Sequence, residues 1–170
     1  MKNALTTITI IIATALLLGC DNQMQQQSSD EKFKQELSAL QADYHNMDQA
    51  FSARHDDDDT KTAAGAAKML KGSDEYFAAC KNIFDRQDAL FAKYNRQLAP
   101  ENVAYVTATL HYGQATHDFW FFLAAHGGAQ QHHNPSDEKE FQRIEKTLEA
   151  ASAEQHKASA ALHQAKAEAK

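Results

Sequence analysis

Histidine is the residue type with the clearest chemical potential in this sequence. The chain of 170 residues holds nine histidines, and most of them fall in its second half. His126, His132 and His133 flank a glycine-rich loop, with Asp137 or Glu138 close enough in sequence to add a carboxylate. Imidazole nitrogens are common ligands of zinc, copper and nickel. The spacing favours solvent-exposed histidines in a polar loop, with a transition-metal site as the alternative interpretation.

The other histidine of interest lies within an apolar helical stretch. His117 follows Gly113 by one helical turn and precedes Trp120. A small residue below such a histidine could make room for a flat ligand such as haem, as in haem-binding bundles. The alternative is a core histidine hydrogen-bonded to a carboxylate or a carbonyl. No C-x-x-C-H motif is present, which excludes covalent c-type haem.

Motifs for catalysis are missing from the sequence. There is no H-x-x-x-H pair, HExxH motif, nucleophile elbow or phosphate-binding loop, and no Cys–His arrangement with a reason to meet. The carboxylates lie on polar helix faces. The sequence therefore predicts a protein that is not an enzyme, without catalytic residues and without a cofactor unless the histidines bind a metal.

The most specific motif is Leu17-Leu18-Gly19-Cys20, which ends an apolar run that follows Lys2. A positive start, an apolar middle and a small residue before a cleavage site are typical of a secretory signal. The segment resembles the lipobox of bacterial lipoproteins. That resemblance implies cleavage before Cys20 and a covalent lipid on its thiol. An uncleaved transmembrane helix is the alternative, but the run is shorter than the roughly 20 residues that span a bilayer.

The resemblance also implies a location and a division of the chain. Residues 1–19 would be the signal peptide, 20–29 the lipidated cysteine and a polar tether, and 30–170 one folded domain facing the periplasm. Asp21 resembles the signal that retains lipoproteins of enteric bacteria on the inner membrane. Two or more acyl chains anchor a protein stably in a membrane. The lipid would therefore attach this protein to the membrane, which is its first expected partner.

Charge and cysteine content narrow the partners further. Without residues 1–19, which contain only the charge of Lys2, 16 Lys and Arg face 23 Asp and Glu, a net charge of −7 with neutral histidines. This acidic balance disfavours nucleic acid as a partner.

Cys80 would be the one remaining cysteine, and its place in an apolar stripe predicts a small buried side chain rather than a reactive thiol.

Apolar residues recur at steps of three and four along most of the chain after residue 30. This spacing places them on one side of a helix, as in helices that pack in bundles. We expect an all-α fold, most simply an antiparallel four-helix bundle. The clearest such stripe consists of Phe33, Leu37, Leu40, Tyr44, Met47 and Phe51.

Local signals predict where the helices begin and end. The first helix should run from about Asp30 to Arg54, and Pro100 should open the third. Around Gly72 we expect one helix to end and another to begin, with a kink in one long helix as the alternative. Ser136 or Asp137 should cap the last helix.

The stretch Phe119, Trp120, Phe121 and Phe122 is apolar on every side of its helix. Such a segment is either buried all round or meets a partner. Together with the lipid anchor, it predicts an envelope lipoprotein that acts through contact with another protein or with itself. A periplasmic metal-binding protein is the alternative function.

Overall fold

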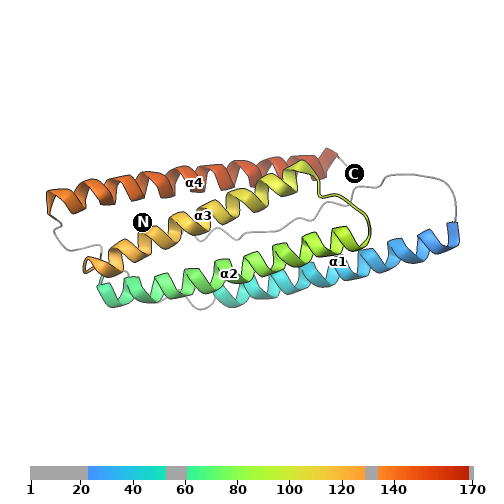
Figure 1. Ribbon diagram of the computed structural model, residues 1–170, viewed down its shortest axis with the longest axis horizontal. Coiled ribbons are helices and arrows are strands. Elements are labelled where there is room, and N and C mark those ends of the chain that lie inside the picture. The colour runs from blue at the N-terminus through green and yellow to red at the C-terminus, as the bar shows by residue number, and fades with distance from the viewer. Residues whose placement is uncertain (1–22, 53–60, 129–133, 169–170) are drawn as a thin grey trace.

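The protein is an all-α four-helix bundle (Figure 1). The computed structural model describes residues 23–52, 61–128 and 134–168. They form helices α1 (Gln23–Ser52), α2 (Ala63–Lys93), α3 (Pro100–Ala125) and α4 (Pro135–Glu168). Among these residues there is no strand, and no helix is both long and apolar enough to cross a bilayer.

The helices pack in the order in which they follow one another along the chain. Backbones of α1 and α2, of α2 and α3, and of α3 and α4 lie side by side, whereas no Cα atoms of α1 and α4 approach within 8 Å. Side chains from all four helices still meet in the central core. That cluster contains Leu40, Tyr44, Tyr76, Cys80, Ile83, Phe84, Tyr105 and Leu162.

The predicted stripe of α1 is confirmed, because its first four residues are buried and Met47 and Phe51 pack against the core. The prediction for α3 is less accurate. Apolar Val103 is 49% exposed, while polar Asn102 and Thr109 are buried. Because α3 packs against both α2 and α4, two of its faces are covered, and a single stripe does not locate them.

Two predicted boundaries are wrong. Helix α1 begins at Gln23, so the backbone of the expected tether is helical from that residue onward. Helix α2 passes through Gly72 without a break, and the Ser73 hydroxyl donates to the Leu70 carbonyl of the same helix at 2.9 Å instead of capping a new one. One glycine costs a helix about 1 kcal/mol, which the packing of α2 against two neighbours outweighs.

The start of α4 also differs from the prediction. Asn134, and neither Ser136 nor Asp137, is the cap: its Oδ1 accepts from the backbone N–H groups of those two residues at 2.9 and 3.0 Å. Pro135 then occupies the first helical position, where its missing N–H is not needed.

The end of α3 is fixed tightly against the start of α2. Gly127 and Gly128 have positive φ angles of 88° and 91°, and the Gly128 N–H donates to the Leu123 carbonyl at 2.7 Å. A Cβ on Gly128 would collide with the backbone of Lys61 and Thr62. Glycine is therefore required here, both for the turn and for the close approach of the two helices.

Candidate functional site

The predicted lipidation site, Cys20, lies outside the described residues, as do His132 and His133 of the predicted metal site. The third histidine of that site, His126, ends α3. Its Nδ1 lies 2.8 Å from the Phe122 carbonyl oxygen, and its ring stacks on the Phe122 ring with centroids 4.0 Å apart. A carbonyl can only accept, so Nδ1 is the donor in this contact. Within the described residues, no three His, Cys, Asp or Glu side chains are grouped to hold a metal ion.

The predicted partner-binding segment divides between core and surface. Phe122 is buried, and Phe119 and Trp120 are half-buried against a cluster that includes Ala66 and Ile144. Only Phe121 points outward, with 58% of its surface exposed. Three of the four side chains therefore hold α2, α3 and α4 together, and one is presented to solvent.

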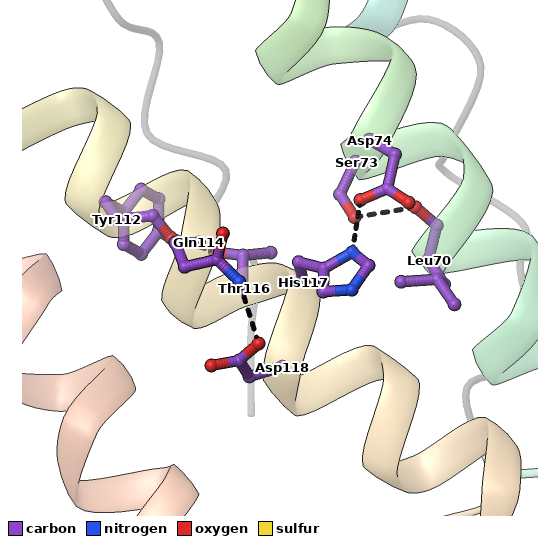
Figure 2. Close-up of polar contacts among 8 residues, drawn as sticks. All are labelled: Leu70, Ser73, Asp74, Tyr112, Gln114, Thr116, His117 and Asp118. Atoms are coloured by element: carbon purple, nitrogen blue, oxygen red, sulfur yellow. Dashed lines mark hydrogen bonds and ion pairs between the residues drawn. The ribbon is translucent and has the colours of Figure 1, made fainter.

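Phe121 is part of an ordered surface group with His117 and Asp74. The rings of His117 and Phe121 stack at 5.9 Å with an interplanar angle of 14°. Figure 2 shows His117 of α3 pointing across to Asp74 of α2, where its Nδ1 lies 2.8 Å from the carboxylate oxygen. The carboxylate fixes the orientation of the imidazole, and the imidazole supports one face of the phenylalanine ring. We call these three residues the His117 surface.

The chemistry available at the His117 surface is limited. A carboxylate can orient an imidazole so that it acts as a general base. The neighbouring Ser73 hydroxyl, however, donates to the Leu70 carbonyl of its own helix and not to His117 (Figure 2). Gln114 binds Asp118 on its own helix at 2.9 Å (Figure 2). The arrangement presents an exposed aromatic ring beside an imidazole that a carboxylate orients.

The space that would accommodate a flat ligand beside His117 is filled. A Cβ on Gly113 would lie 2.7 Å from both Cγ and Cδ1 of Phe77. The glycine thus makes room for the Phe77 ring of α2. His117 is paired with a carboxylate, as in the alternative interpretation, but its side chain is 40% exposed and does not belong to the core.

Sequence reasoning missed a buried polar cluster in the central core. It consists of Tyr44, Asp48, Tyr76, Cys80, Tyr105 and Thr109, all at most 8% exposed. The Tyr76 hydroxyl donates to Asp48 Oδ1 at 3.0 Å and lies 3.5 Å from the Tyr44 hydroxyl. The Tyr105 and Thr109 hydroxyls have no hydrogen-bond partner among the described residues. Tyrosines at stripe positions indicate that hydroxyl groups enter the core. The sequence does not show which of them binds Asp48, because that partner is on another helix.

A groove of about 410 Å³ runs between α1 and α2. Ala39, Leu40, Ala89 and Leu90 line it, and the Glu36–Lys93 ion pair of 2.6 Å closes part of its edge. Lys93, followed by the Tyr94 hydroxyl, lowers the pKa of the Glu36 carboxyl. The opposite charges at the edge pair with each other, so they do not favour a ligand of either charge in the groove.

The chain matches no family model, no curated protein and no solved structure.

Proposed function

We propose that this protein is a lipid-anchored lipoprotein of the bacterial cell envelope that acts without catalysis, by binding another envelope protein or a second copy of itself. The Leu17–Cys20 motif supports the anchor. The observation that carries the binding function is Phe121, a large aromatic side chain that is 58% exposed and lies nearly parallel to the His117 ring, with centroids 5.9 Å apart. Exposed, preordered aromatic residues are frequent energetic anchors of interfaces.

The bundle separates the proposed anchor from the proposed interface. The N-terminal half of α1 lies beside the end of α2, as the Asp30–Arg96 ion pair shows. Helix α3, whose last two turns contain Phe121, ends at the other end of the bundle, beside the start of α2 (Figure 1). Helix α1 has 30 residues, a length of about 45 Å at 1.5 Å per residue. In the proposed arrangement the partner meets the end of the bundle that is remote from the lipid.

The anchor is tested by labelling cells with a palmitate analogue. The chain has two cysteines, which supply a matched pair of variants. Cys20→Ser should lose the label and leave the membrane fraction, whereas Cys80→Ser should keep both. A label that persists in Cys20→Ser would exclude lipidation at this position.

The interface is tested with a photoreactive amino acid at position 121 in intact cells. Val103 is the matched control, because it is the other large apolar side chain of α3 that is strongly exposed. A crosslinked species is expected from position 121 and not from 103. Phe121→Ser should keep the helical content and lose the complex isolated from cells, and Val103→Ser should keep both. A complex that survives Phe121→Ser would rule out this surface as the interface.

Metal binding is the second candidate, and the orientation of His126 favours it. Metal-bound histidines commonly donate the other ring N–H to a carbonyl or a carboxylate, as His126 does to Phe122. A calorimetric titration with zinc and copper at pH 7.5 tests this function. Binding should disappear in the His126, His132 and His133 triple alanine variant and persist in His156→Ala, an exposed histidine of α4. Equal affinity at pH 5 and pH 7.5 would exclude imidazole ligands.

A further inference from the structure

One carboxylate between α1 and α2 differs from the others in its partner. Three acids of α1 form ion pairs with cations of α2 or the turn after it: Asp30 with Arg96, Glu36 with Lys93, and Asp43 with Arg86. Asp48 is instead 6% exposed, and the described residue that binds it is a phenol, Tyr76. Its charge, when present, has no cation within ion-pair distance in the described part of the chain.

The hydrogen bonds around Asp48 form a directed chain. Tyr76 has one proton and donates it to Asp48, so it accepts from Tyr44 at 3.5 Å. A protonated Asp48 could donate to Tyr76 instead, and the chain would then run in the opposite direction. The cluster can therefore satisfy both protonation states with hydrogen bonds, but only the neutral state avoids a buried charge.

Asp48 is the carboxylic acid of this cluster, whereas its other titratable groups are phenols and a thiol, which ionise at higher pH. The charged or titratable groups facing it are Tyr44 and His45 from α1, Tyr76 and Cys80 from α2, and Tyr105 from α3. Burial raises the pKa of Cys80 and of Tyr105 to about 12 each and raises those of Tyr44 and Tyr76 further. Asp48 is therefore the group of the buried cluster that changes charge at the lowest pH.

The pKa of Asp48 itself is raised by burial, which the hydrogen bond from Tyr76 and the proximity of His45 partly oppose. A carboxyl group with a raised folded-state pKa favours the folded state most below its unfolded pKa. That contribution is lost as the pH rises through the folded pKa. Asp48 of α1 binds Tyr76 of α2, and the backbone of α1 lies against α2 alone. The free-energy cost of ionising Asp48 therefore weakens the α1–α2 contact.

We propose that Asp48 and Tyr76 form a proton-dependent latch between the C-terminal half of α1 and α2. Proton uptake by the carboxyl group tightens this contact, and ionisation loosens it. The latch would make the position of α1 respond to the pH of the medium around the protein. It does not depend on the lipid anchor or on the Phe121 interface.

The latch is tested by hydrogen exchange on the full chain in detergent, with rates divided by the intrinsic exchange rate at each pH. Peptides covering residues 44–52 should be less protected at pH 8 than at pH 4, by at most about tenfold for each pH unit between the pKa of a solvated carboxyl and the raised pKa of Asp48. Peptides of α4 around Ile144 serve as the internal reference and should change little. Equal protection of residues 44–52 at both pH values would overturn the proposal.

Three variants identify the titrating group. Asp48→Asn can still accept from Tyr76 and should be protected equally at both pH values. Asp43→Asn, an exposed position of the same helix, should keep the pH dependence, as should His45→Gln. A pH dependence that survives in Asp48→Asn, or disappears in His45→Gln, would overturn the proposal.

A fourth variant decides the matter if Asp48→Asn does not fold. Tyr76→Phe removes a hydrogen bond that lowers the pKa of Asp48, so the midpoint of the exchange transition should move to higher pH. An unchanged midpoint would overturn the proposal.

Discussion

Gly113 of α3 lies directly against the Phe77 ring of α2, and a Cβ at that position would come within 2.7 Å of Cγ and Cδ1. Both ring atoms are near the stem of the side chain, where little movement is possible. The Phe77 ring also contacts Tyr76 and Tyr112 edge to face, with centroids 5.2 and 5.9 Å apart. The glycine thus sets how closely α2 and α3 approach in the centre of the bundle.

Gly113→Ala should therefore lower the free energy of unfolding, although alanine is the better helix former. Overpacking costs about 1–3 kcal/mol, and helix propensity returns about 1 kcal/mol. We expect a net loss of about 1 kcal/mol in urea unfolding. Phe77→Leu in the same chain should make Gly113→Ala less harmful, because the clashing ring is gone. Additive losses in the double variant would show that the two residues do not interact in this way.

Thr109→Val should stabilise the protein, by about 1 kcal/mol, because the Thr109 hydroxyl is fully buried without a partner in the described residues. Thr116→Val on the same helix is the control. Its hydroxyl donates to the Tyr112 carbonyl at 2.8 Å, so its replacement should be neutral or slightly destabilising. Denaturant titration of both variants measures the difference. Destabilisation by Thr109→Val would mean that the hydroxyl has a partner in solution.

Asn134→Ala should cost about 1 kcal/mol, the usual effect of removing an N-cap side chain. Ser136→Ala should have almost no effect, since Ser136 contributes its backbone N–H to the cap. Thermal unfolding of the two variants distinguishes these positions. Equal losses would place the cap elsewhere.

Cys80 should react slowly with iodoacetamide in the folded protein. Burial raises the pKa of its thiol to about 12, so little thiolate is present at pH 8, and the side chain is fully covered. The measurement uses Cys20→Ser, in which Cys80 is the remaining thiol, with and without urea. Similar rates in both conditions would contradict the buried position.

Much of the bundle could be predicted from the sequence, because the spacing of residues such as Leu37 and Tyr44 fixes one buried face of a helix whatever its neighbours are. The uninterrupted α2 could not, since the signal at Gly72 is local and weak, and tertiary packing outweighs it. The cap at Asn134 was within reach, because an Asn-Pro pair matches an N-cap followed by the first helical residue.

The buried polar cluster could not be predicted in the same way. Asp48 and Tyr76 are 28 residues apart, and their contact depends on the register between α1 and α2. Nor does the sequence distinguish Phe121 from Phe122: one is exposed and one is buried because α3 is covered on two sides. In both cases the deciding information is the position of a neighbouring helix.

The order in which the helices pack also bears on how the chain acquires its structure. Each backbone contact joins helices that are adjacent in the sequence, so the loops that must close are short. Proteins dominated by such local contacts fold in microseconds to milliseconds. The α1–α2 hairpin, with its own ion pairs and aromatic contacts, can therefore assemble while the second half of the chain is still emerging, and α3 and α4 can be added to a surface that already exists.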